Sequence, residues 1–103
     1  MPDKEFEPKI EFHAQAREEL AESSEWYEDR KSGLGEEFLN EVESKLQKIA
    51  IRPNSFAVVH NDVRQASLIR FPYLIYYVIK SPVIFIISIW HKKRNRDGWK
   101  NRL

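Results

Sequence analysis

The first half of the chain combines a short run with strand periodicity and two longer runs with helical periodicity. Residues 9–13 alternate in polarity and predict a first strand. Residues 14–31 are rich in helix formers, and Gly33 is well placed to end this predicted helix as a C-terminal cap. A second helix, over residues 34–51, ends before Pro53, because the residue preceding a proline is pushed out of the helical region. Its apolar stripe consists of Leu34, Phe38, Val42, Leu46 and Ile49.

The second half of the chain has the pattern of an antiparallel meander. Runs rich in β-branched and aromatic residues predict strands over residues 55–60, 63–71, 73–80 and 83–90. The last two runs are apolar on both faces, as expected for central strands that are covered by another layer. The helical hairpin is the available cover. The pattern therefore predicts an α+β fold in the order β-α-α-β-β-β-β, with the hairpin on one face of the sheet and residues 1–103 forming a single domain.

Charge is distributed unevenly along the sequence. The net charge is +1, yet residues 1–51 carry 7 Lys and Arg against 14 Asp and Glu, whereas residues 52–103 carry 10 against 2. A basic half on a rigid sheet favours an anionic partner, either a nucleic acid or an acidic protein.

Composition excludes several other classes of protein. The chain has no cysteine, so disulfides and thiolate metal sites are absent, and we expect no metal and no cofactor. Residues 71–90 have the length of a membrane span, but a lysine and a proline in the middle of the run argue against one. The first ten residues lack the apolar stretch of a signal peptide. We therefore expect a cytoplasmic protein with no membrane association.

A basic segment follows the last predicted strand and contains Lys92, Lys93, Arg94 and Arg96. Alternation within residues 63–71 places Arg64 and Arg70 on one face of that strand. Together these cations could converge on a phosphate path or a carboxylate cluster. In the alternative interpretation, the two arginines pair with the acidic helices or face water.

His91 is the one histidine with cationic neighbours. Those charges would keep it neutral near pH 7, a suitable state for the general base of RNA cleavage, with Arg94 stabilising the phosphorane. The alternative is a histidine that only ends a strand. Most aromatic residues are expected in the core, whereas Tyr73 and Trp99 lie at element ends and could stack on bases. Asp97-Gly98 is a turn signal with little core after it.

Five sequence pieces, in order, resemble the RelE/ParE superfamily of toxins from bacterial type II toxin–antitoxin systems. They are the helix at 14–20 with Trp26-Tyr27-Glu28, the stretch from Gly33-Leu34-Gly35 to Glu43, Ile49 before Pro53, Arg70-Phe71-Pro72-Tyr73 running into Ile75-Tyr76-Tyr77, and Ile87 to His91 with Arg94 and Trp99. The resemblance implies a helical hairpin packed on an antiparallel sheet. It also implies an antitoxin whose C-terminal segment wraps the toxin and covers its basic groove.

The superfamily divides by mechanism, and the sequence departs from its ribonuclease branch. Tyr73 stands where RelE-like toxins carry an arginine, and the region of their paired lysines holds Ala66, Ser67 and Leu68. Both departures favour the ParE branch, whose members act on DNA gyrase. In contrast, His91 falls where some ribosome-dependent members have a catalytic histidine, Arg94 falls in the tract of a phosphate-contacting arginine, and Arg70 matches an arginine common to both branches.

The resemblance thus implies a growth-inhibiting toxin of the plasmid-stabilisation type, held in a hetero-oligomer by its cognate antitoxin and acting on a bacterial target such as DNA gyrase. One alternative is a ribosome-dependent mRNA endoribonuclease that uses His91 with Arg64, Arg70 and Arg94. Another is an inactive relative that retains only antitoxin binding. Under each reading, Lys92, Lys93, Arg96 and Tyr73 are expected near the partner.

Overall fold

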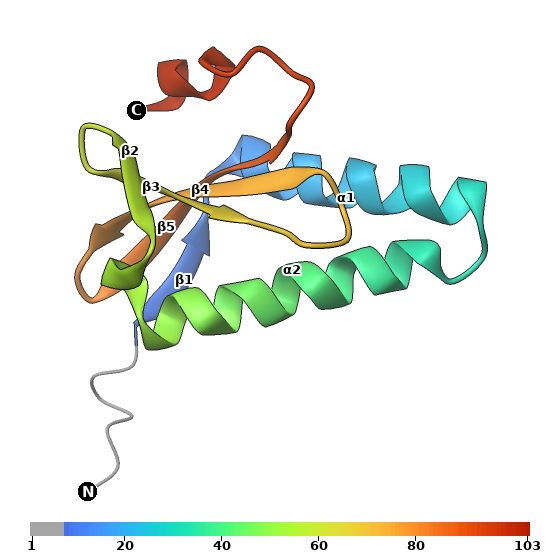
Figure 1. The fold of residues 1–103 in the computed structure, drawn as a ribbon, viewed down its shortest axis with the longest axis horizontal. Helices are drawn as coiled ribbons and strands as arrows, with labels where there is room; N and C mark the ends of the chain where they lie inside the picture. Colours follow the sequence, from blue (N-terminus) through green and yellow to red (C-terminus); the bar gives the residue numbers. More distant parts are fainter. Residues whose placement is uncertain (1–7) are drawn as a thin grey trace, which may run out of the picture.

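A computed structural model describes residues 8–103 of the chain (Figure 1). The elements are β1 (Lys9–Phe12), α1 (Ala14–Arg30), α2 (Leu34–Ile51), the 3-10 turn η2 (Pro53–Ser55), β2 (Ala57–His60), β3 (Val63–Ser67), β4 (Tyr73–Lys80), β5 (Val83–His91) and the 3-10 turn η3 (Gly98–Arg102). The predicted α+β class and the predicted order of elements are confirmed.

The five strands form one sheet in the order β1-β5-β4-β3-β2. Strands β2 to β5 form the predicted antiparallel meander. β1 lies beside β5 and runs parallel to it, with Lys9 opposite Val83 and Phe12 opposite Ile86, so the sheet is mixed. The two helices lie between β1 and the meander in the sequence, and they provide the long connection that a mixed sheet of this kind needs.

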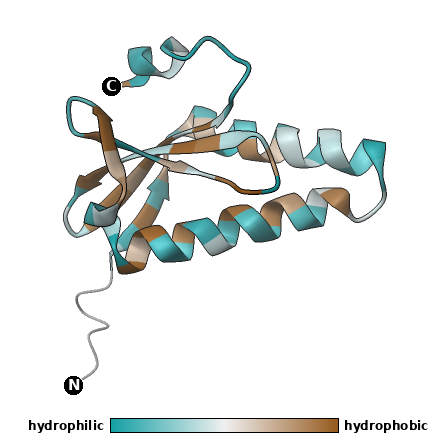
Figure 2. Cartoon of the chain, in the orientation of Figure 1, coloured by the Kyte–Doolittle hydropathy of each residue, from teal (hydrophilic) through white to brown (hydrophobic). Residues whose placement is uncertain are grey.

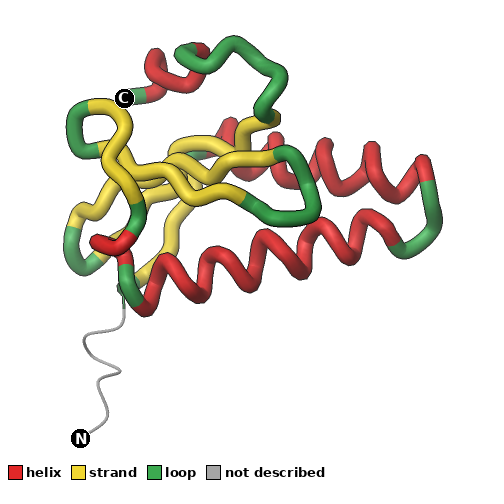
Figure 3. Tube along the Cα trace, in the orientation of Figure 1, coloured by secondary structure: helices red, strands yellow, loops and turns green. Residues whose placement is uncertain are grey.

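The helical hairpin covers one face of the sheet (Figures 1 and 3). Hydrophobic residues line the strands, and α2 carries a clearer apolar stripe than α1 (Figure 2). The core between helices and sheet includes Ala16, Phe38, Val42, Ile49, Ile75, Tyr77, Ile84, Ile86 and Ile89. Burying aliphatic and aromatic side chains of this size stabilises the fold by about 1.5–3 kcal/mol each.

Two glycines make the tight turn between the helices possible. Gly33 has φ +88°, in the left-handed region that other residues rarely adopt. At Gly35 a Cβ would lie 2.5 Å from the carbonyl oxygen of Ser24, so only glycine allows the helices to approach this closely. The Glu28 carboxylate accepts hydrogen bonds from the N–H groups of both glycines and holds the turn.

β3 ends four residues earlier than the sequence predicts. The N–H groups of Ile69 and Arg70 donate to the Glu41 carboxylate on α2 instead of to a neighbouring strand. Arg70 therefore lies in the β3–β4 loop and does not share a strand face with Arg64, which corrects the sequence-based placement.

The C-terminal segment packs on the face of the sheet that the helices leave open (Figure 1). Trp99 in η3 is 2% exposed and joins a second core cluster with Val63, Tyr76, Val78 and Trp90. The expectation of little core after Asp97 is therefore wrong. Within residues 8–103 no helix is long and apolar enough to cross a membrane.

Candidate functional site

A cleft of about 540 Å³ lies on the open face of the sheet, beneath the C-terminal segment. We call it the basic cleft. Its lining consists of Val59, Gln65, Ser67, Leu74, Tyr76, Trp90, Lys92, Arg94, Arg96, Asp97, Trp99 and Lys100. Strands β3, β4 and β5 supply its floor, and the segment after β5 supplies its cationic wall.

The basic cleft has a surplus of positive charge, because two of its cations, Lys92 and Arg96, form no ion pair among the described residues. Four cationic side chains line it against one carboxylate, that of Asp97. Asp97 forms an ion pair of 2.8 Å with Lys100, whose hydrogen bond and charge lower the pKa of the Asp97 carboxyl. An anionic partner would therefore meet a surplus of positive charge on a rigid sheet.

Two tryptophans shape the basic cleft. The guanidinium carbons of Arg94 and Arg102 lie 3.6 Å and 5.3 Å from the Trp90 ring centroid, close enough for cation–π attraction. The Trp99 ring stacks on Tyr76 with centroids 4.2 Å apart. Among the described residues, the buried indole N–H groups of Trp90 and Trp99 have no acceptor.

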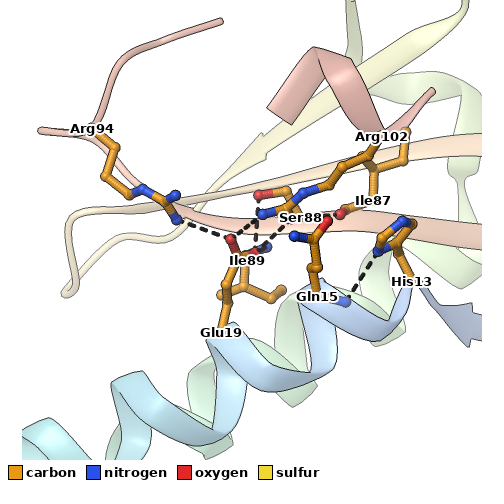
Figure 4. Close-up of polar contacts among 8 residues, drawn as sticks. All are labelled: His13, Gln15, Glu19, Ile87, Ser88, Ile89, Arg94 and Arg102. Carbon is orange, nitrogen blue, oxygen red and sulfur yellow. Dashed lines mark hydrogen bonds and ion pairs between the residues drawn. The ribbon is translucent and has the colours of Figure 1, made fainter. Parts of the chain in front are cut away.

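A single carboxylate, that of Glu19 on α1, holds this C-terminal segment in place (Figure 4). The Glu19 side chain is 12% exposed and accepts hydrogen bonds from Arg102 at 2.6 Å and from Arg94 at 2.9 Å. It also accepts from the N–H of Ile89 and from the Ser88 hydroxyl, while Arg102 donates to the carbonyl oxygen of Ile87. We call this arrangement the Glu19 clamp.

The Glu19 clamp takes the place of a strand neighbour. β1 pairs with β5 only as far as Ile86, so the end of β5 has a free edge on that side. Glu19 and Arg102 supply partners to the backbone of Ile89 and Ile87 along that edge. Glu19 was not among the residues predicted from the sequence, although its spacing of three residues from the buried Ala16 indicates that this carboxylate faces the sheet.

Glu19 makes the stability of the fold depend on pH. Burial raises the pKa of the Glu19 carboxyl, but the hydrogen bond and charge of Arg102, with help from Ile89 and Arg94, outweigh burial, and the pKa lies below its usual value. Its stabilising contribution is thus complete above the unfolded pKa of about 4.3 and is lost as the pH falls through the folded pKa.

We expect urea titrations to show the free energy of unfolding falling from about pH 5 to about pH 3. The fall should be smaller in Glu19→Gln and unchanged in Glu18→Gln, an exposed control; equal falls in all three proteins would contradict the assignment.

The arginines predicted to converge do not meet at the basic cleft. Arg64 donates to the carbonyl oxygens of Phe56 at 2.6 Å and Asn54 at 3.1 Å, next to η2. Arg70 forms an ion pair of 2.8 Å with Glu37 on α2. Arg70 thus pairs with an acidic helix, as in the alternative interpretation of these arginines.

His91 and Tyr73 face the helical side of the sheet. Their rings lie 4.9 Å apart, and neither side chain lines the basic cleft. The Nδ1 atom of His91 accepts a hydrogen bond from the N–H of Lys93, and burial together with the charge of Lys93 lowers the pKa of His91. Tyr73 is 8% exposed and packs against Phe38, and Trp99 is 2% exposed, so most of each ring is buried within the fold.

Of the predicted cationic segment, Lys92, Arg94 and Arg96 line the basic cleft and Lys93 does not. Lys100 completes the set and was missed, because it lies beyond the turn at Asp97-Gly98. The two residues predicted as catalytic, His91 at the end of β5 and Arg94 three residues later, both line a small hollow of about 110 Å³. In this hollow Arg94 is paired with Glu19, and His91 lies beside Tyr73.

A model of a known protein family matches most of the chain. The family model described as "ParE toxin of type II toxin-antitoxin system, parDE" matches residues 10–96. The chain belongs to this ParE toxin family. Membership confirms the resemblance to RelE/ParE toxins and identifies the chain as a type II toxin, for which the family suggests an antitoxin partner.

A solved structure has a similar fold. A chain of the "Chromosomal ParDE TA system from P. aeruginosa" superposes on this ParE-family chain with a TM-score of 0.67 and 17% identity, over 84% of this chain and 97% of that chain. At this identity the likeness concerns the fold. No curated protein matches the sequence significantly.

Proposed function

We propose that this ParE-family toxin arrests growth by binding a bacterial target such as DNA gyrase in the cytoplasm, and that it is not a nuclease. One observation supports the proposal: His91 lies outside the lining of the basic cleft, and Arg94, which borders both that cleft and the small hollow at His91, is already paired with Glu19. A ribonuclease would need its acid–base group within hydrogen-bond reach of the phosphate and nucleophile that its cations hold.

We propose that a cognate antitoxin neutralises the toxin by covering the same cleft with an acidic or amphipathic segment. The excess of positive charge along the lining favours carboxylates from such a segment. The toxin would then reside in a toxin–antitoxin hetero-oligomer until the antitoxin is removed.

Two assays on one protein test the target. The purified chain should inhibit negative supercoiling of relaxed plasmid by DNA gyrase, and brief induction in bacteria should arrest growth. Primer extension of messenger RNA from the same cells should reveal no new ends within translated codons. Abundant new ends, together with loss of toxicity in a folded His91→Ala variant, would overturn the proposal in favour of a ribosome-dependent nuclease. If induction causes neither growth arrest nor cleavage, the proposal is also overturned, and the chain is an inactive relative.

Removing two charges from the basic cleft should weaken target binding. We expect the double variant Lys92→Gln/Arg96→Gln to bind gyrase about tenfold less tightly at low salt, with a shallower dependence on salt. Neither side chain forms an ion pair among the described residues, so the fold should be preserved. Surface plasmon resonance at two salt concentrations would measure both effects.

The matched control for that variant is Lys31→Gln/Lys48→Gln, which removes the same charge from the turn after α1 and from α2. It should bind like the unmodified protein. Equal losses in the two double variants would mean that net charge, and not the basic cleft, sets the affinity.

A further inference from the structure

A second cleft, of about 490 Å³, lies on the helical side of the sheet. We call it the aromatic cleft. Residues of α1 form one wall, and the end of the β3–β4 loop, the start of β4 and the end of β5 form the other. Its lining consists of Glu22, Ser23, Trp26, Tyr27, Pro72, Tyr73 and His91.

The aromatic side chains of this cleft are arranged to attract a cation. Trp26 is 51% exposed, an unusual degree for a tryptophan, and its ring packs edge-to-face on Tyr27 with centroids 5.1 Å apart. The guanidinium of Arg30 already lies 3.9 Å from the Trp26 ring centroid, yet Arg30 does not line the cleft. The Trp26 ring is thus suited to a guanidinium and also borders an open cleft.

The lining of the aromatic cleft contains one carboxylate, that of Glu22, and neither lysine nor arginine. Arg94, which lines the adjoining hollow with Glu22, is paired with Glu19. The helix that forms this wall is acidic, with six carboxylates against Arg17 and Arg30. Among residues 8–103, no cation forms an ion pair with Glu22. Burial and the charge of Lys93 lower the pKa of His91, which favours its neutral form.

We propose that the aromatic cleft receives an arginine side chain of a protein partner, with the guanidinium on the Trp26 ring and paired with the Glu22 carboxylate. Arginine fits better than lysine, because its planar guanidinium can stack on a ring and bind a carboxylate through two hydrogen bonds at once. The chain therefore offers two chemically opposite docking sites, the basic cleft for an anionic segment and the aromatic cleft for a cationic one. This inference holds whatever the cellular target of the toxin.

Titration with N-acetyl-arginine amide tests the site on the unmodified chain. In ¹H–¹⁵N spectra we expect the Trp26 indole signal, assigned from its loss in Trp26→Phe, to shift with a dissociation constant in the millimolar range. The indole signals of Trp90 and Trp99, on the open face of the sheet, should stay in place. N-acetyl-citrulline amide has nearly the same shape without the charge and should bind at least about threefold more weakly.

A pair of matched variants assigns the interaction to the cleft. Glu22→Gln should weaken binding of the arginine amide about threefold or more, whereas Glu18→Gln, an exposed position on the same helix outside the cleft, should leave it unchanged. No shift of the Trp26 signal, equal binding of citrulline amide, or equal binding by Glu22→Gln would each overturn the proposal.

Discussion

Replacing Glu19 with alanine should lower the free energy of unfolding by about 3–5 kcal/mol, the range expected when one partner of a buried ion pair is removed. The Arg102 side chain is 7% exposed and would keep its charge with no carboxylate beside it. The N–H of Ile89 would lose its acceptor at the same time.

Urea unfolding measures this effect, with Glu18→Ala as the matched control. Glu18 is exposed on the same helix, so its loss should change the free energy of unfolding by less than about 0.5 kcal/mol. A double variant, Glu19→Leu/Arg102→Leu, removes both charges and should recover part of the loss, because no uncompensated charge stays buried. A loss below about 1 kcal/mol in Glu19→Ala would mean that the clamp does not hold the C-terminal segment.

The helices, most strand boundaries and the fold class could be predicted from sequence because they rest on local periodicity. The apolar stripe from Phe38 to Ile49 indicates which face of α2 is buried, whatever the rest of the chain does. The end of β3 could not be predicted this way. It depends on Glu41 of α2, which lies 28 residues from Ile69 in the sequence. The Glu41 carboxylate accepts a hydrogen bond from the N–H of Ile69.

The positive charge of the candidate site could be predicted from the sequence, but the set of residues that the fold brings together there could not. The basic segment indicated a cationic surface, and Lys92, Arg94 and Arg96 do line one cleft. The Glu19 clamp joins residues up to 83 positions apart, which no local pattern encodes. Strand alternation does predict the side of the sheet on which His91 lies. Neighbouring residues of a strand point to opposite faces, and because Trp90 faces the basic cleft, His91 faces the helices.

Replacing Trp99 with alanine should lower the free energy of unfolding by about 3–5 kcal/mol, as for other large aromatic side chains removed from a core. The indole is almost fully buried and stacks on Tyr76, with the two ring planes 23° apart. Gly98 allows this packing, since a Cβ there would lie 2.8 Å from the Trp90 ring. The loss should appear in urea unfolding, and Trp26→Ala, which removes an exposed indole, should lower stability by less than about 1 kcal/mol.

The Trp99→Ala variant also tests whether the basic cleft needs a docked C-terminal segment to bind its partner. Trp99 anchors the segment that carries Arg96 and Lys100, so its loss should release one cationic wall and weaken binding to the proposed gyrase target even under conditions where the sheet stays folded. Trp99→Phe keeps an aromatic ring on Tyr76 and should retain most of the stability and the binding. If Trp99→Ala were no less stable than Trp26→Ala, the C-terminal segment would not be docked on the sheet, and the basic cleft would lack the wall that gives it its charge.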